Sequence, residues 1–149
     1  MLKKIILHFS KLNLSNVNFA SSNIFAKAID YLLLEFNTFD PKRGDTSTPL
    51  ELIELMISLL NPTNKMTIYD PFLGLGGFLI GSLRYSSKGD RSKKSNFLYG
   101  QEINATTFKT CKLYMYFNGV LRANICLGDT LISPQHVQKN TKSLMKFDR

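Results

Sequence analysis

The stretch of sequence that decides the fold of this chain is Asp70-Pro71-Phe72-Leu73-Gly74-Leu75-Gly76-Gly77-Phe78-Leu79, a turn rich in glycine. Residues 66–69 before it combine β-branched and aromatic side chains, a pattern typical of a buried strand. The apolar residues after it recur at helical spacing and are Phe78, Leu79, Ile80 and Leu83. Glycine has no Cβ atom, and the free amides that open a helix favour an anionic group. This strand, turn and helix therefore predict a loop that holds a cofactor.

The spacing of the glycines indicates which cofactor the loop suits. A dinucleotide-binding loop needs a further glycine where this chain has Leu79, so a nicotinamide or flavin cofactor is disfavoured. Asp70 at the end of the strand can accept a charge-assisted hydrogen bond from an ammonium group. That chemistry favours an amino-acid-like ligand such as S-adenosylmethionine. A glycine-rich turn without a ligand remains the alternative at this point, because short motifs also occur by chance.

Length and composition limit the chain to one compact domain. Its 149 residues, 44% of them hydrophobic, suffice for a single core. The formal net charge of +8 favours a polyanionic partner without requiring one. The apolar part of residues 1–7 is too short for a signal peptide, and no run reaches the roughly 18 apolar residues of a membrane span. We therefore expect a cytoplasmic protein that does not bind membranes.

Cysteine and histidine do not form a ligand pattern in this sequence. Cys111 and Cys126 lack CxxC spacing, so we expect both to be reduced residues of the core. His8 and His136 lie in dissimilar segments without further ligands at metal spacing. The sequence therefore predicts no metal site and no role for either histidine.

Two amphipathic helices are expected before the glycine loop. The first spans residues 23–36, and its apolar positions are Ile24, Phe25, Ala28, Ile29, Leu32, Leu33 and Phe36. In the second, the sequence Thr48-Pro49-Leu50-Glu51 predicts a capping box with proline at the first helical position. The apolar stripe of this second helix consists of Leu52, Leu55, Met56, Leu59 and Leu60, and Asn61-Pro62 ends it. Both stripes are expected to pack into the core.

Two further strands and a helix are expected after the loop. Residues 97–102 and 124–127 have strand character, and a helix from Ala105 to Asn118 is closed by Gly119. Residues 86–96, which lie between the helix after the glycine loop and the strand at 97–102, are polar, and this composition predicts an exposed loop. Alternation of strands and helices predicts a parallel sheet with right-handed crossovers, whose ligands bind beyond the carboxyl ends of the strands.

An acidic residue follows each of the three predicted strands. These residues are Asp70, Glu102 and Asp129, so they are expected to line one crevice. Glu102 follows the glycine loop at about the spacing at which an acidic residue meets ribose hydroxyls, and Asp129 is placed to accept from an adenine amine. The alternative is that each is a solvated turn residue.

These segments together resemble a known family. Residues 44–50, 70–78, 99–103 and 128–131 occur in the order seen in N6-adenine DNA methyltransferases, and the chain resembles the modification subunit of a type I restriction-modification system. The resemblance runs from about residue 23 to the C-terminus, and its motifs are specific jointly.

The resemblance implies a role for each matching residue. Those that would flank the methionine part of S-adenosylmethionine are Thr46, Ser47, Thr48, Pro49 and Leu50. Those that would hold its amino-acid end are Asp70, Gly74, Leu75, Gly76 and Gly77. Glu102 would bind the ribose hydroxyls, and Asp129 would lie near the adenine.

The chain departs from the family pattern around the cofactor. The family loop has a small residue or cysteine, then glycine, then serine or threonine, where this chain has Leu73, Gly74 and Leu75. A leucine there either crowds the ligand or packs inward. The family also carries an aromatic pair where this chain has Thr46 and Ser47.

A larger departure concerns catalysis. The family's Asn-Pro-Pro-aromatic segment, which accepts hydrogen bonds from the target amine and stacks on the flipped base, is absent from this sequence. Neither Asn61-Pro62-Thr63 nor Asp70-Pro71-Phe72 stands in the right place to replace it, and residues 146–149 resemble the lead-in to the strand that carries it. We therefore assign no catalytic residue and expect a fragment. A sheet of three strands is expected to leave an unpaired edge and an uncovered apolar face.

The predicted fold is an α/β fold, a partial S-adenosylmethionine-dependent methyltransferase with a Rossmann-like parallel sheet. Residues 1–43 are expected to form a helical N-terminal segment, and residues 44–149 the cofactor-binding part of the methyltransferase domain. The implied partners are DNA and the specificity and restriction subunits of a type I system. The alternative function is an inactive remnant that acts as an interaction or DNA-binding module. Lysines in residues 88–94 and Lys139, Lys142 and Lys146 would contact phosphates, although solvated loops have the same composition.

Overall fold

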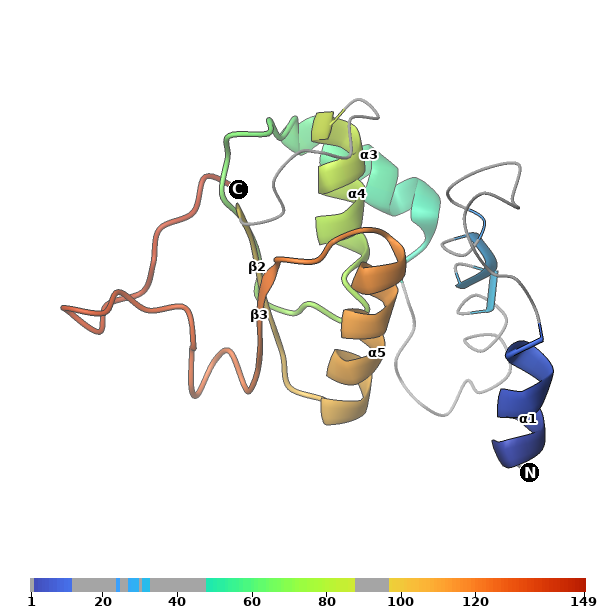
Figure 1. Ribbon diagram of the computed structural model, residues 1–149. Coiled ribbons are helices and arrows are strands. Elements are labelled where there is room, and N and C mark those ends of the chain that lie inside the picture. The colour runs from blue at the N-terminus through green and yellow to red at the C-terminus, as the bar shows by residue number, and fades with distance from the viewer. Residues whose placement is uncertain (1, 12–23, 25–26, 30, 33–47, 88–96) are drawn as a thin grey trace.

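The computed structural model describes residues 2–11, 24, 27–29, 31–32, 48–87 and 97–149. Its elements, in chain order, are α1 (Leu2–Phe9), α3 (Leu50–Leu60), β1 (Ile68–Asp70), α4 (Gly77–Ser87), β2 (Leu98–Glu102), α5 (Ala105–Phe117) and β3 (Asn124–Leu127) (Figure 1). In the described part of the chain, the strands form one parallel sheet of order β1-β2-β3. The predicted α/β fold with a parallel sheet is therefore confirmed.

The register of the sheet places the strand ends side by side. Asp70 of β1 is aligned with Gly100 of β2, and Glu102 of β2 is aligned with Leu127 of β3. Because parallel strands run in one direction, the turns that follow them gather at a single edge of the sheet.

Helices α4 and α5 cover one face of this sheet (Figure 1). The buried core on that face consists of Ile68, Leu73, Leu79, Ile80, Leu98, Cys111, Met115 and Val120. Gly76 makes the close approach possible, since a Cβ atom there would lie 2.9 Å from both Cys111 Sγ and Met115 Cε. Cys111 is a free thiol of the core, as predicted, and burial raises its pKa to about 12. Cys126 is free as well but only half-buried.

The packing face of α3 differs from the one predicted. Ile53 and Ile57 are its buried residues, whereas the predicted stripe of Leu52, Leu55, Met56, Leu59 and Leu60 is exposed. The reason lies in α4, where Cβ atoms at Gly77 and Gly81 would lie 2.9 Å and 2.5 Å from the Cδ1 atoms of Ile53 and Ile57. The apolar residues of α3 span most of its circumference, with only Glu51, Glu54 and Ser58 on the remaining side, so these glycines rather than the periodicity decide which apolar side packs.

The start of α3 also differs from the prediction. The helix begins at Leu50, and Pro49 is its N-cap residue, with no side-chain capping hydrogen bond. The predicted capping box with proline at the first helical position is therefore wrong. The predicted end is confirmed, because Asn61 adopts a left-handed conformation with φ of 45° and its amide donates to Ile57 O.

The second face of the sheet is covered by residues 129–149 rather than by a helix (Figure 1). Tyr69 and Tyr99 are register partners on this face, and the rings of His136 and Phe147 pack against both of them. His136 is buried, and its Nε2 lies 2.9 Å from Gly100 O. His136 therefore has a packing role that its isolated place in the sequence did not indicate, and the expectation of an uncovered face is wrong.

The free edge of β1 is occupied by the last residues of the chain. The amide of Tyr69 donates to Arg149 O at 2.9 Å, and the amide of Arg149 donates to Thr67 O at 3.2 Å. The side chain of Asp148 accepts from both the amide and the hydroxyl of Thr67 at 2.8 Å. The expectation of an unpaired edge is thus wrong for β1.

The N-terminal third of the chain is described only in part. Positions 24, 27–29 and 31–32 are helical, as expected for the helix over residues 23–36. Ile24, Ala28 and Leu32 are exposed, so their predicted packing in the core is wrong. Phe25, Leu33 and Phe36, the basic run 88–94, and the predicted site residues Thr46 and Ser47 lie outside the described residues.

Candidate functional site

The turn between β1 and α4 is held in place by its own backbone and by β2. The amide of Leu73 donates to Gln101 O at 2.9 Å, and the amide of Gly76 donates to Leu73 O at 2.8 Å. Leu73 is buried and fills the space above Gly100, where a Cβ atom would lie 2.8 Å from Leu73 Cδ1. Leu73 therefore packs inward, away from the surface of the loop, and Leu75 is half-buried.

The glycines of the loop have different tasks. Gly76 has φ of +81° and packs against Cys111 and Met115 of α5, whereas a Cβ atom at Gly77 would crowd only the end of the Ile53 side chain of α3. Gly74 has φ of +53°, and a Cβ atom there would meet only Phe72 O, at 4.0 Å. Among the three, Gly74 is thus the one whose missing side chain leaves space open next to the loop.

Glu102 ties the end of β2 to this loop. Its Oε2 accepts a hydrogen bond from the amide of Gly74 at 2.8 Å, and its Oε1 accepts one from the amide of Asn104 at 2.7 Å. Asn104 in turn caps α5, since its side chain accepts from the amides of Thr106 and Thr107. An ionised carboxylate has about four acceptor positions. Glu102 therefore retains acceptor capacity for a ligand while it positions the loop.

Asp70 carries a carboxylate that the protein satisfies only in part. Its Oδ1 accepts from the amide of Phe72 at 3.1 Å, whereas its Oδ2 is buried and has no hydrogen-bond partner in the described structure. Burial raises the pKa of Asp70, the hydrogen bond from Phe72 opposes that rise, and the charge of Glu102 adds to it. A cationic hydrogen-bond donor beside Oδ2 would offset both the desolvation of the carboxylate and its repulsion by Glu102.

Asp129 lies in the turn after β3, and its carboxylate serves that turn. Its Oδ1 accepts from the amides of Leu131 at 2.8 Å and Ile132 at 3.1 Å. The turn is joined to its neighbours because the amide of Gly128 donates to Glu102 O at 2.9 Å. Glu102 is thus bonded to the loop at Gly74, its charge acts on Asp70 at the start of that loop, and Asp129 lies on the adjoining turn.

Three exposed apolar side chains accompany the acids and were not among the residues predicted for the site. Phe72, Ile103 and Leu131 are 68%, 66% and 80% exposed, and each follows one of the acids by one or two positions. Exposed apolar side chains of this size beside polar groups are typical of ligand sites. The signal that would have found them is this repeated order of acid and apolar residue at strand ends.

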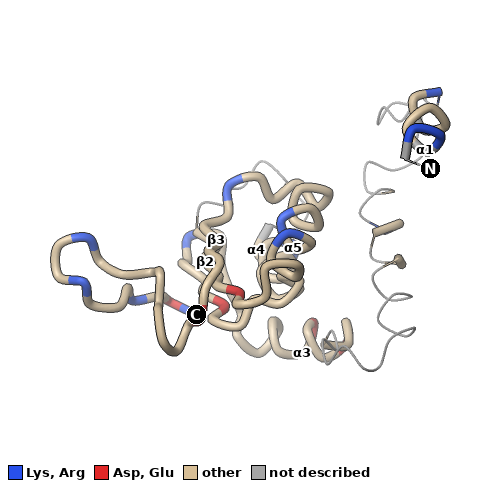
Figure 2. The backbone as a smooth tube through the Cα atoms, turned by 90° about the horizontal axis from the view of Figure 1, so that it is seen from below, with Lys and Arg blue, Asp and Glu red and all other residues tan. Residues whose placement is uncertain are grey.

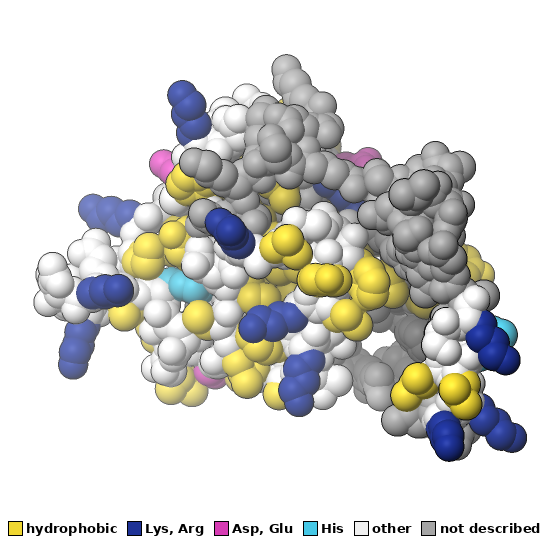
Figure 3. Space-filling model, in the orientation of Figure 1, with side chains coloured by type: hydrophobic (Ala, Val, Ile, Leu, Met, Phe, Trp, Pro, Cys, Tyr) yellow, Lys and Arg dark blue, Asp and Glu magenta, His cyan; other side chains and the backbone are white. Residues whose placement is uncertain are grey.

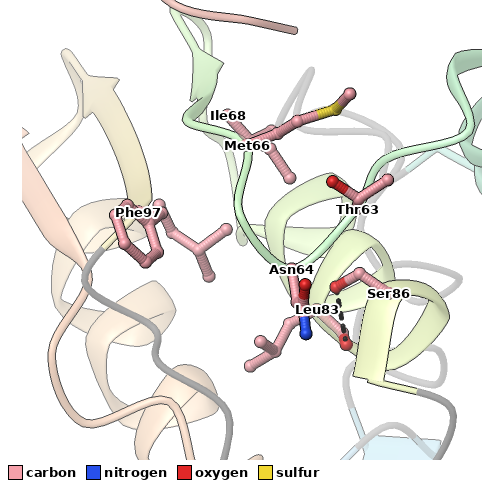
Figure 4. A pocket seen from close by; sticks show the side chains of 8 residues that line it. Thr63, Asn64, Met66, Ile68, Leu83, Ser86 and Phe97 are labelled. Carbon is pink, nitrogen blue, oxygen red and sulfur yellow. Dashed lines mark hydrogen bonds between the residues drawn. The ribbon is translucent and has the colours of Figure 1, made fainter.

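The remaining predicted residues lie at the start of α3. Thr48 and Pro49 directly precede the helix, and Leu50 is exposed in its first turn. A hollow lined by Thr63, Asn64, Met66, Ile68, Leu83, Ser86, Phe97 and Leu98 lies at the amino ends of β1 and β2, the opposite end of the sheet from the acids (Figure 4). Its polar groups are few, and Ser86 Oγ is already bonded to Leu83 O.

The described residues show neither a metal cluster nor a membrane-spanning helix. No group of three or more His, Cys, Asp or Glu there is arranged to hold a metal ion. None of the helices described has both the length and the apolarity needed to cross a membrane.

Comparison with known proteins gives a consistent picture. The model of a family described as N-6 DNA Methylase matches residues 20–148. The type I restriction enzyme HindI methylase subunit of Haemophilus influenzae is 28% identical over 142 residues, which cover 93% of this chain and 32% of that protein. The MjaVIII methylase subunit of Methanocaldococcus jannaschii is 30% identical over 137 residues, covering 91% of this chain and 22% of that protein.

Solved structures agree on the fold. The methyltransferase subunit of a type I restriction-modification system from Streptococcus thermophilus superimposes with a TM-score of 0.71 at 24% identity, over 93% of this chain and 30% of that one. A putative type I modification subunit from Vibrio vulnificus gives a TM-score of 0.68 at 17% identity, over 87% of this chain and 28% of that one. The chain spans about a third or less of the length of these relatives.

Proposed function

Because this chain belongs to the N-6 DNA methylase family, we propose that the carboxyl edge of its sheet is the S-adenosylmethionine site of an adenine-specific DNA methyltransferase. The proposal places the cofactor-binding part in residues 44–149 and a helical segment in residues 1–43. By the names of its relatives, the system would be a type I restriction-modification system, with DNA and the specificity and restriction subunits as partners.

The observation that carries this proposal is the buried, unpartnered Oδ2 of Asp70. The α-ammonium group of S-adenosylmethionine is a cation with several donors, so it would satisfy Oδ2 and offset the repulsion between Asp70 and Glu102. The open side of Gly74 leaves room for the amino-acid end to approach the backbone.

The other groups of the edge suit the remaining parts of the cofactor. Glu102 has acceptor positions left over after bonding Gly74 and Asn104, and two neighbouring ribose hydroxyls are matching donors. The exposed side chains of Ile103 and Leu131 suit a purine ring, which gains from burial against apolar surface. Asp129 stands on the same turn as Leu131, where it would meet the exocyclic amine of the adenine.

The proposal assigns binding and orientation to these residues. When bound, S-adenosylmethionine supplies a methyl group on a sulfonium, which an amine nucleophile can accept. An adenine amine is a poor nucleophile and needs positioned hydrogen-bond acceptors. No Asn-Pro-Pro-aromatic segment that would provide them occurs in this sequence, so no catalytic residue is proposed.

Titration calorimetry with S-adenosylmethionine tests the proposal. The wild-type chain should bind, and Asp70→Asn and Glu102→Gln should each weaken binding roughly tenfold or more, the scale of a lost hydrogen bond to a charged group. Glutamine at position 102 keeps one acceptor oxygen, so the amide of Gly74 retains its partner while the amide of Asn104 loses its bond.

A matched control is Glu54→Gln on the exposed side of α3, which removes the same charge away from the edge. It should bind with wild-type affinity. Absence of binding by the wild-type chain, or equal affinity for all four proteins, would show that the cofactor assignment is wrong.

A further inference from the structure

Residues 136–145 form a short hairpin that stands out from the helix-free face of the sheet. The amide of Met145 donates to His136 O at 3.0 Å, and the amide of Gln138 donates to Ser143 O at 2.8 Å. Val137 and Leu144 form an antiparallel bridge, and the amide of Lys142 closes the turn on Gln138 O at 3.0 Å. The hairpin projects from the sheet on the side opposite α4 and α5 in two perpendicular views (Figures 1 and 2).

The base of the hairpin is fastened to the sheet by buried polar groups. Gln101 is fully buried, and its amide group donates to Ser133 O and accepts from the amide of Gln135, both at 2.9 Å. His136 is held between Tyr69 and Tyr99 by its bond to Gly100 O. Burying a polar group costs desolvation free energy unless the group is hydrogen-bonded. Here the bonds of Gln101 and His136 fix the direction in which the exposed hairpin projects from the sheet.

The hairpin carries positive charge only. Lys139 and Lys142 in the hairpin and Lys146 directly after it are all exposed, and no Asp or Glu occurs between Asp129 and Asp148. Lys142 has φ of 54°, a conformation uncommon for residues other than glycine, in the turn between the other two lysines. Cationic side chains stand out from the corresponding edge of the molecule in Figure 3.

We propose that this hairpin binds the phosphate backbone of duplex DNA. A hydrogen-bonded hairpin presents its lysines with little loss of backbone freedom on binding, and a two-stranded ribbon is narrow enough to enter the major groove. Its charge supplies sequence-independent attraction to phosphates. The choice of DNA among polyanions rests on the proposed function. The hairpin is anchored to the same sheet whose carboxyl edge would hold the methyl donor.

The test compares two triple variants with equal loss of charge. In the first, Lys139, Lys142 and Lys146 are replaced by glutamine, and in the second the exposed lysines Lys3, Lys4 and Lys11 of the N-terminal helix region are replaced in the same way. Figure 2 places the two sets at opposite ends of the molecule. Binding of a short mixed-sequence DNA duplex is measured by fluorescence anisotropy over a series of salt concentrations.

The wild-type chain should show a linear fall of log affinity with log salt. For the hairpin variant the slope should be smaller in magnitude by up to about 2.7, because each phosphate contact contributes about 0.9. The variant of Lys3, Lys4 and Lys11 should keep the wild-type slope. Equal changes in both variants, or no change in either, would overturn the proposal, since binding would then follow net charge or other elements.

Two further measurements distinguish DNA binding by the hairpin from membrane binding and from the proposed cofactor site. Vesicles containing phosphatidylserine should bind the hairpin variant and the wild-type chain alike, and loss of vesicle binding without loss of DNA binding would point to a membrane instead and overturn the proposal. S-adenosylmethionine binding by the hairpin variant, measured by calorimetry, should equal that of the wild-type chain. Failure of the cofactor site would therefore appear in calorimetry with the wild-type chain, and failure of the hairpin in the salt slope.

Discussion

The two faces of the sheet are covered in different ways. On one face, α4 and α5 contribute apolar side chains such as Leu79 and Met115 to a core that requires Gly76 for close approach. On the other, residues 129–149 lie over Tyr69 and Tyr99 and are held by hydrogen bonds from buried polar side chains, above all Gln101.

The difference concerns what each covering depends on. The helical face is stabilised by burial of apolar area, which is spread over many contacts. The other face depends on a few directed hydrogen bonds, and losing one leaves buried polar atoms unpaired. We therefore expect damage to the helical face to unfold the domain and damage to the other face to release one segment.

The largest effect is expected on the helical face. Leu79 is fully buried, so Leu79→Ala should lower the free energy of unfolding by about 2–5 kcal/mol. Thermal unfolding followed by circular dichroism measures this, and all regions should be destabilised together. Leu113→Ala on α5, where the side chain is 54% exposed, serves as the control and should change the midpoint little. Equal effects of the two substitutions would contradict the assignment of the core.

A smaller and more local effect is expected on the other face. Gln101→Met removes both hydrogen bonds to Ser133 and Gln135 at nearly constant volume and should cost about 1–3 kcal/mol. Hydrogen exchange should speed up in residues 133–145, while the amides of α4 stay protected. Gln138→Met in the exposed hairpin is the matched control. If α4 lost protection to the same extent, the two faces would be a single cooperative unit and the comparison would fail.

A third test concerns Asp70, at the carboxyl ends of the strands. The pKa of Asp70 is raised chiefly by burial, so its ionised form opposes folding above that pKa, and the opposition is absent once the carboxyl is protonated in both states. Asp70→Asn should therefore raise the thermal midpoint near neutral pH, with the gain disappearing as the pH falls to the ordinary range of aspartate. The same variant should bind S-adenosylmethionine less well. A lower midpoint at neutral pH would contradict this account of Asp70.

The smallest effect is expected at the edge of β1. Hydrogen bonds from the amide and hydroxyl of Thr67 lower the pKa of Asp148, so the contribution of this carboxylate is present above its ordinary pKa and is lost as the pH falls through the lowered value. The protection factor of the Thr67 amide, which compares its exchange rate with the intrinsic rate at the same pH, should fall on acidification in the wild-type chain and should depend less on pH in Asp148→Asn. The amides of α5 should not respond, and a response there would link this edge to the helical face.

Prediction from sequence succeeded where a pattern repeats and failed where a single contact decides. The apolar spacing after the glycine loop correctly predicted that Leu79 and Ile80 are buried. The same reasoning chose the wrong side of α3, because apolar residues that span most of a helix's circumference do not indicate which of them are buried. The glycines at 77 and 81 select Ile53 and Ile57, a choice that depends on which helices meet.

The site shows the same division. Asp70, Glu102 and Asp129 were predicted from their positions after strands. In the structure Glu102 is bonded to the loop at Gly74, and its charge acts on the carboxylate of Asp70. The sequence did not indicate the exposed apolar residues beside them, nor the buried contacts of His136, because one histidine among polar residues has no distinctive spacing.

The sequence by itself determined the order of strands and helices, the parallel sheet and the family, since these follow from local propensity, periodicity and motifs in order. Only the tertiary structure decided the covering of the second face, the packing side of α3, the inward position of Leu73 and the unpartnered oxygen of Asp70. Each of these depends on contacts between residues that are distant in the sequence. Such residues become neighbours only when the chain has folded, so their burial and hydrogen bonding cannot be read from local sequence.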